Sequence, residues 1–255
     1  MSSWIIVKNK QRKKVTVITK YHDTSLSGDV FSMYLDYIGA YCYSIRLGET
    51  CNVWDSNGLI KESLRLTPQV KLLKEKPEID ALTVDEYKTM TNNLTFKEIQ
   101  KITASLIVYD DSLNRSVIKV LEKVGIKTIF DIGIQLVTGA DEQLLKHFVV
   151  LVKGFQVKSK KEKLNIYIMA DSYDSVVEFQ KLCDSSWKIT SLSKNTPRDS
   201  SENFIQVLAE VKIMTALPAL ILDFNRPVDK FIYLMRRNEK LDYFFELNST
   251  EWNLF

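Results

Sequence analysis

The feature that most constrains the fold is an apolar run at residues 129–137, which lies between two stretches with the periodicity of amphipathic helices. Such a run is typical of a strand buried on both faces, as strands of parallel sheets are. Thr138 and Gly139 follow as the turn at its carboxyl end. Ligands of open α/β sheets bind at this end of a strand. A binding site is therefore expected here, although residues 135–137 offer one amide and no charge.

Strands and helices alternate along the rest of the sequence. Strands are predicted at residues 14–20, 50–54, 105–109, 164–170, 187–192 and 219–222. Helices are predicted at residues 29–47, 111–124, 141–155, 173–183 and 200–214, and from Pro227 onward. The pattern is less regular in between, where it predicts a strand at 70–73 and short helices at 84–90 and 96–102.

This alternation predicts the fold class. Strands joined through helices of ten or more residues need crossover connections, which are right-handed and produce parallel sheets. The expected fold is α/β, with two Rossmann-like doubly wound parallel sheets facing a crevice. A helix that closes at Gly125 marks the expected boundary, which gives an N-terminal domain at 1–125 and a C-terminal domain at 126–255.

Charge and hydropathy exclude several classes of protein. The formal charge of the 255 residues is +3, from 35 basic and 32 acidic side chains. No field of one sign is expected to recruit nucleic acid, and the basic clusters at 8–14 and 158–161 contain no aromatic residue for base stacking. No apolar run approaches the length of a membrane span, and the first ten residues lack a signal-peptide core.

The three cysteines, Cys42, Cys51 and Cys183, have no CxxC or CxxH spacing, so a structural zinc site is not expected. Cys42 lies in an apolar helical pattern and Cys51 beside a predicted strand. Both are expected to be reduced core residues. We therefore expect a cytoplasmic or otherwise intracellular protein without a bound metal.

Candidate catalytic residues are few. Asp110 and Asp111 follow the strand predicted at 105–109, where paired carboxylates suit a hard cation or a general base; the alternative is a helix cap beside a solvated acid. His22 lies in a polar loop close to Gly28 and suits a base, although a loop histidine is more often solvated. P-loop, GxSxG, HExxH and GxGxxG motifs do not occur in the sequence.

Candidate binding residues follow two other predicted strands. Asp171 ends the strand at 164–170, where it would hold a nucleotide base or ribose, or else cap the next helix. Arg226 precedes Pro227 and would contact phosphate, or else remain a surface arginine. The aromatic residues of the C-terminal tail are expected to dock on their own domain or on a partner protein; they include Phe244, Phe245, Trp252 and Phe255.

Several stretches are similar, in the same order, to one family. Residues 27–31, with the aromatic helix ending at 45–48, look like an opening glycine turn, here Gly28, and a first helix. Residues 166–171 look like a strand that ends in a Thr-Asp pair, with Ala170 replacing the threonine. Residues 204–233 are similar to a closing helix, strand and helix. Together they resemble the fucosyltransferases with two Rossmann domains (GT-B type), which include α1,2- and α1,6-linking enzymes and bacterial nodulation relatives.

The most specific match is Ile134 to Ala140, IQLVTGA, which looks like the family's His-x-Arg-x-Gly-Asp or His-x-Arg-Arg motif. In that family the arginine binds the pyrophosphate of GDP-fucose. Here Gln135 stands in place of the histidine, Val137 of the arginine and Ala140 of the acid. The donor-binding residues that the resemblance implies are Gly28, Gln135, Thr138, Gly139, Asp171, Asn225 and Arg226.

A second motif of the family is altered too. Where those enzymes have paired serines at a helix N-terminus, this chain has Asp223 to Pro227, DFNRP. Arg226 would partly replace the missing positive charge, whereas Asp223 would repel a phosphate. Losing an arginine contact to a buried charge costs on the order of 2 to 5 kcal/mol.

These observations lead to two functional expectations. The first is a glycosyltransferase-like protein that has lost nucleotide-sugar binding and acts as a structural or binding component of a larger assembly, such as a virion. The alternative is an active fucosyltransferase-like enzyme that moves a sugar from a donor such as GDP-fucose to a glycan acceptor. In the alternative, Asp110 or His22 would be the acid/base candidate and the GDP-sugar the only added group.

Overall fold

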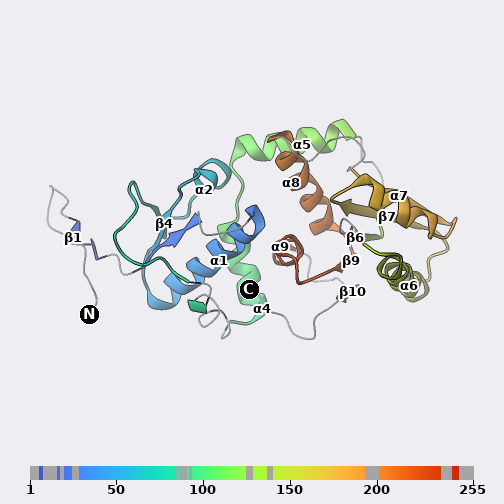
Figure 1. The fold of residues 1–255 in the computed structure, drawn as a ribbon, viewed down its shortest axis with the longest axis horizontal. Coiled ribbons are helices and arrows are strands. Elements are labelled where there is room, and N and C mark those ends of the chain that lie inside the picture. The colour runs from blue at the N-terminus through green and yellow to red at the C-terminus, as the bar shows by residue number, and fades with distance from the viewer. Residues whose placement is uncertain are drawn as a thin grey trace. The chain divides into compact units, whose positions relative to one another are not determined.

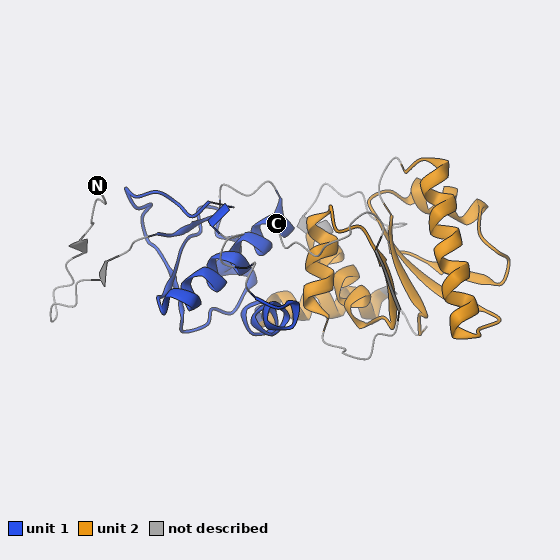
Figure 2. Ribbon diagram, turned by 90° about the horizontal axis from the view of Figure 1, so that it is seen from below, with its two compact units in different colours: residues 1–110, 253–255 blue, residues 111–252 orange. Residues whose placement is uncertain are grey.

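The computed structural model describes residues 6–7, 16–17, 20–24, 29–83, 85–86, 91, 94–124, 129–136, 140–192, 201–236 and 243–246. The chain divides into two compact units, which Figure 2 shows in different colours. Unit 1 comprises residues 1–110 and 253–255, and unit 2 comprises residues 111–252. The helix at 111–124 thus belongs to unit 2, whereas the expected boundary at 125/126 placed it in the first domain.

Unit 1 contains a small parallel sheet in the order β3-β4-β5. Its elements are β3 (His22–Asp23), α1 (Val30–Leu47), β4 (Cys51–Trp54), α2 (Leu59–Ser63), β5 (Val70–Leu72) and α4 (Phe96–Leu106). A parallel bridge between Tyr21 and Ala81 adds a contact beside β3. The short β1 (Ile6–Val7) and β2 (Thr16–Val17) pair with each other. Of the strand predicted at 14–20, Thr16 and Val17 form β2, and residues 14, 15, 18 and 19 lie outside the described residues.

Helix α1 begins and ends as the sequence predicts. The Asp29 side chain accepts hydrogen bonds from the backbone N–H groups of Phe31 and Ser32 and so caps the helix. Gly48 ends it in the left-handed conformation, with φ of 67°. The tyrosine stripe of α1 is core, because Tyr34 and Tyr37 have no exposed surface. The burial of these apolar side chains holds α1 against the sheet.

The strand predicted at 105–109 is wrong. Ser105 and Leu106 form the last turn of α4, and Tyr109 makes only an isolated antiparallel bridge with Leu64. The cause lies at the other end of α4, where Thr95 and Glu98 form a reciprocal capping box. From that start the helical spacing of Ile99, Thr103 and Leu106 buries one face, and the helix continues into the apolar stretch.

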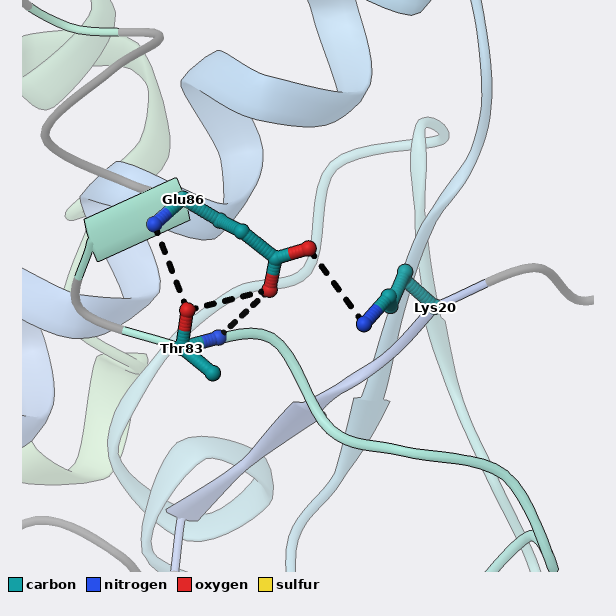
Figure 3. Close-up of polar contacts among 3 residues, drawn as sticks. All are labelled: Lys20, Thr83 and Glu86. Carbon is teal, nitrogen blue, oxygen red and sulfur yellow. Dashed lines mark hydrogen bonds and ion pairs between the residues drawn. The ribbon is translucent and has the colours of Figure 1, made fainter.

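A polar cluster joins the segment before β3 to the segment that follows Ala81. Glu86 accepts hydrogen bonds from the backbone N–H and hydroxyl of Thr83, at 2.8 and 3.2 Å, and pairs with Lys20 at 3.3 Å (Figure 3). Thr83 accepts the N–H of Glu86 in return. The ion pair is one-third exposed, so its net stabilisation is small.

Unit 2 is an α/β unit with a five-stranded parallel sheet in the order β10-β9-β6-β7-β8 (Figure 1). Its helices are α5 (Asp111–Val124), α6 (Glu142–Ser159), α7 (Tyr173–Lys181), α8 (Ser201–Ala216) and α9 (Pro227–Met235). Its strands are β6 (Ile132–Leu136), β7 (Leu164–Ala170), β8 (Trp187–Thr190), β9 (Ala219–Leu222) and β10 (Tyr243–Glu246). Numbered within the unit, the strand order is 3-2-1-4-5, as in Rossmann domains.

Both faces of this sheet are covered. Apolar side chains of α6 and α7 pack with alternate residues of β6, β7 and β9 into one core. Helix α8 lies on the other face, next to α9, and its Glu210 accepts a hydrogen bond from Tyr167 of β7 at 3.2 Å. All five residues of β6 are buried, as the apolar run predicts. The strand begins only at Ile132, and Ile129 is 85% exposed.

The beginning of the C-terminal tail belongs to this sheet. Residues 243–246, which include Phe244 and Phe245, form β10 and pair in parallel with β9. The backbone of this part therefore docks on its own unit, one of the two outcomes expected for the tail. Trp252 and Phe255 lie outside the described residues.

Candidate functional site

The strand order of unit 2 creates a switch point between β6 and β9, because the chain leaves these neighbouring strands toward opposite sides of the sheet. Three polar side chains lie at the carboxyl ends of the strands around this point. Gln135 is the fourth residue of β6, Asp171 follows β7, and Arg226 follows β9 and caps α9. We call these three residues the switch-point cluster.

Arg226 joins the cluster. Its guanidinium donates to the Asp171 carboxylate at 2.8 Å and to the side-chain oxygen of Gln135. The side chains of Arg226 and Asp171 are 22% and 28% exposed, so the ion pair is shielded from solvent without being closed off. The structure thus brings together three of the sequence-predicted binding residues, and Arg226 is not an isolated surface arginine.

Asp171 does not cap the helix that follows it. Ser172 is the N-cap of α7, and its hydroxyl accepts the backbone N–H of Asp174 at 3.2 Å. The Asp171 carboxylate instead bonds Arg226. Of the two sequence expectations for Asp171, helix cap and binding residue, the cap is therefore wrong.

Gln135 is almost fully buried, with 1% of its surface exposed. Its oxygen accepts from Arg226, while its Nε2 has no hydrogen-bond partner among the described residues. A buried donor left without a partner costs about 1 to 3 kcal/mol. Gln135 thus holds a buried donor at the switch point that has no partner among the described residues.

Two more carboxyl groups lie near Arg226. Asp229, in the first turn of α9, has no exposed surface and accepts the backbone N–H of Asp223 at 2.9 Å. Burial raises the pKa of Asp229 to about 8, the largest effect, while the nearby Arg226 charge acts in the opposite direction. Asp223 itself accepts the N–H of Asn225. Arg226 therefore has two acids in its surroundings, its partner Asp171 and the buried Asp229.

Asp229 was not among the residues that the sequence singled out. An aspartate three positions after a helix cap is ordinary, because negative charge in a first turn complements the helix dipole. Only the contact with Asp223 and the complete burial distinguish it. The sequence offers one weak signal, which is that Asp229 lies among the apolar residues Val228, Phe231 and Ile232.

The expected exposed position of His22 is wrong. His22 belongs to β3, is 1% exposed, and stacks on Tyr37 with ring centroids 6.3 Å apart. Burial lowers its pKa to about 4, although the Asp23 charge opposes the shift. Asp23 is itself paired with Lys76 at 3.0 Å. His22 is therefore a buried, neutral core residue of unit 1.

Asp110 and Asp111 lie where the chain passes from α4 into the first turn of α5. The backbone N–H of Asp110 bonds the Ser63 carbonyl at 2.9 Å, whereas Asp111 is the first residue of α5. Within the part of the chain that the structure describes, no group of three or more His, Cys, Asp or Glu side chains could hold a metal ion. Gly28, Thr138 and Gly139 lie outside the described residues.

The cysteines and the hydropathy of the helices follow the sequence analysis. Cys42 and Cys51 are buried and free, and burial raises the pKa of both thiols to about 12. Among the described residues, no helix is both long and apolar enough to cross a bilayer.

The similarity of this chain to known proteins lies in its three-dimensional structure. No protein-family model and no curated protein matches the sequence. NodZ α-1,6-fucosyltransferase soaked with GDP-fucose superposes with a TM-score of 0.57 and 10% identity over 85% of this chain and 90% of the other. Fucosyltransferase NodZ from Bradyrhizobium gives 0.56 and 10% identity over 85% and 91%. An Arabidopsis thaliana FUT1 mutant in complex with GDP gives 0.55 and 10% identity over 89% and 70%. The chain has a fucosyltransferase-like α/β fold.

Proposed function

We propose that this chain is a glycosyltransferase-like protein that has lost the binding of a nucleotide-sugar diphosphate and acts as a binding or structural component of a larger assembly. The observation that carries the proposal is that the Arg226 guanidinium already has partners within the protein. Its guanidinium is bound to Asp171 and Gln135 at the point where a donor phosphate would need it.

The charges of the switch point support this proposal. A diphosphate carries at least two negative charges and needs cations or a metal ion to meet them. Here the Arg226 guanidinium is already paired with the Asp171 carboxylate. A diphosphate would have to displace Asp171 from Arg226 and would then lie beside the released carboxylate. The loss of one arginine contact to a buried charge already costs on the order of 2 to 5 kcal/mol.

The resemblance to the donor motif of fucosyltransferases points the same way. Gln135 and Val137 stand where that motif has a histidine and a pyrophosphate-binding arginine. In the structure Gln135 supplies a neutral amide at the switch point. The solved relatives include NodZ with GDP-fucose and FUT1 with GDP, so the comparison concerns enzymes that hold this ligand class.

A second candidate function is an active glycosyltransferase that uses Arg226 as its phosphate contact. The observation in its favour is the position of Arg226 as the N-cap of α9, with no side-chain cap bond. A helix N-terminus offers amide donors and the positive end of a dipole to an anion. Since Arg226 is 22% exposed, a phosphate could reach it if Asp171 released it.

Titration calorimetry with GDP and GDP-fucose, with and without Mg²⁺ or Mn²⁺, separates the two functions. The proposed function predicts no binding tighter than about 1 mM, or 4 kcal/mol. A dissociation constant of tens of micromolar or less, weakened by Arg226→Ala, would establish the second candidate. Asp174→Asn is the matched control, because it removes an exposed charge near Asp171 without touching Arg226.

A further inference from the structure

The outer surface of helix α6 carries apolar and basic side chains in one stripe. Val150 and Val157 are 63% and 78% exposed and lie seven residues apart. The exposed Lys146 and Lys153 lie on the same side of the helix, because steps of three and four residues keep side chains on one face. Isolated exposed valines are ordinary, but a seven-residue repeat on one face is the spacing at which one helix packs against another. We call these four residues the α6 stripe.

Helix α7 carries the opposite charge on the same side of unit 2. Both helices cover one face of the sheet, where they follow the adjacent strands β6 and β7. Asp174 and Glu178 are exposed and lie four residues apart, which places them on one side of α7; we call them the α7 stripe. The pKa of Asp184, just after α7, is lowered mainly by hydrogen bonds from Ser186 and in addition by the charge of Lys153. The basic stripe therefore borders the acidic helix.

A surface with a basic stripe beside an acidic one is complementary to a copy of itself. In a two-fold symmetric contact, the first stripe of each copy meets the second stripe of the other. We propose that the chain forms a homodimer in which the α6 stripe of one copy packs against the α7 stripe of the other, with Val150 and Val157 buried in the contact. This inference goes beyond the proposed function and holds whether or not the chain binds a nucleotide-sugar.

The ion pairs within each helix do not prevent this contact. Lys146 pairs with Glu142 at 2.7 Å, and Lys181 pairs with Glu178 at 2.5 Å. All four side chains are more than half exposed, so these pairs contribute little stability in water. An approaching copy can exchange them for intermolecular pairs, which are stronger where the valine side chains exclude water.

The charges on this surface argue against two other occupants. An anionic bilayer or a nucleic acid would attract the lysines of α6 but would repel Asp174 and Glu178. A helix that lies in a membrane surface also carries large apolar residues such as Trp, Phe or Leu on its inserted face, whereas the α6 stripe exposes two valines. A second copy of the chain complements both signs of charge.

The test is sedimentation equilibrium of the full-length chain from about 1 to 100 μM, in about 0.05 and 0.5 M NaCl. The proposal predicts a reversible dimer with twice the mass of one chain and a dissociation constant of about 10 μM at the lower salt concentration. The higher salt concentration should weaken the dimer about tenfold, because it screens the charges at the edge of the contact. A chain that stays monomeric throughout, or a dimer that salt does not weaken, overturns the proposal.

Charge reversal assigns the surface. One double variant combines Lys146→Glu with Lys153→Glu, and the other combines Asp174→Lys with Glu178→Lys. Each places like charges against each other in its own homodimer and should weaken association about tenfold or more. An equimolar mixture of the two should form a dimer again, because each contact then joins an acidic stripe to a basic one. Lys119→Glu, at an exposed position of α5, is the control and should dimerise as the unaltered chain does.

The remaining outcomes are decisive as well. A dimer that neither double variant weakens uses another surface and overturns the proposal, as does a mixture of the double variants that stays monomeric while circular dichroism shows both to be folded. A monomeric chain that cosediments with vesicles of phosphatidylserine and phosphatidylcholine, and no longer does so with Lys146→Glu and Lys153→Glu, would assign α6 to a membrane surface instead. None of these results depends on the titration with GDP, so failure of the dimer leaves the proposed function as it stands.

Discussion

Asp229 accepts the backbone N–H of Asp223 across the turn that connects β9 to α9, at 2.9 Å and without any exposed surface. The N–H bond satisfies one carboxyl oxygen, and the other has no partner among the described residues. A buried carboxyl in this position is more stable with its proton than without it. The turn that carries Arg226 is thus held by an acid that stays neutral at pH 7.

This arrangement predicts that Asp229→Asn changes the pH dependence of stability. Burial raises the pKa of Asp229 to about 8 in the folded state, against 3.8 for the unfolded chain. Between these values the folded state holds a proton that the unfolded state lacks, so the unaltered chain loses stability as the pH rises. From pH 4 to pH 8 the free energy of unfolding should fall by several kcal/mol more than in the variant, because each pH unit between the two pKa values contributes about 1.4 kcal/mol.

Urea denaturation of both proteins at pH 4, 6 and 8 measures this difference. Parallel curves for the two proteins would contradict the account of Asp229.

His22→Phe should have the opposite dependence. Burial lowers the pKa of His22 to about 4, below the 6.5 of the unfolded chain. Between these values the unfolded state holds the extra proton, so the unaltered chain loses stability as the pH falls from about 6.5 to 4. The variant keeps a ring against Tyr37 and has no proton to gain. Thermal melts of both proteins at pH 7 and pH 5 test this, and an unchanged difference in Tm would show that His22 is accessible to protons.

Gly133 of β6 is packed closely against Met214 of α8, against Leu217, and against Leu220 of β9. A Cβ atom there would meet Leu217, Met214 and Leu220 side-chain atoms at 2.6, 2.7 and 2.8 Å. Gly133→Ala should therefore cost about 1 to 3 kcal/mol of unfolding free energy, because three neighbours have to move at once.

Gly154→Ala is the matched control in the same unit. No atom lies within 4 Å of the added Cβ, and Gly154 is inside helix α6. The substitution should stabilise unit 2 by about 0.5 to 1 kcal/mol, since alanine loses less backbone entropy in a helix. Urea midpoints give both values. Equal effects of the two substitutions would rule out the close packing at Gly133.

Patterns within short segments predicted much of the fold. Helical periodicity located α1 and α6, whose N-caps Asp29 and Asp141 only the structure identified. The buried run of β6 identified the centre of the sheet in unit 2. The stretch at 105–109 was misread because an apolar run of five residues has no periodicity that separates a strand from the last turn of a helix. His22 was misread because a two-residue strand is too short to show alternation.

The candidate site could be predicted only in part. Parallel strands bring their carboxyl ends to one edge, which placed Gln135, Asp171 and Arg226 at the same side of the sheet. Their pairing could not be foreseen, because Asp171 and Arg226 are 55 residues apart and either could have remained in solvent. The burial of Asp229 likewise depends on how α9 packs, which its own sequence does not specify.

The most direct test of the central claim is a calorimetric comparison of GDP with guanosine on the unaltered chain and on Arg226→Ala, in the presence of Mg²⁺. The account predicts that the diphosphate adds nothing: GDP binds no more tightly than guanosine, and Arg226→Ala does not lower the affinity for GDP selectively. A GDP affinity about 100-fold above that of guanosine, equivalent to about 2.7 kcal/mol and abolished by Arg226→Ala, would contradict it. Arg226 would then be a phosphate ligand and the chain a nucleotide-sugar-binding protein.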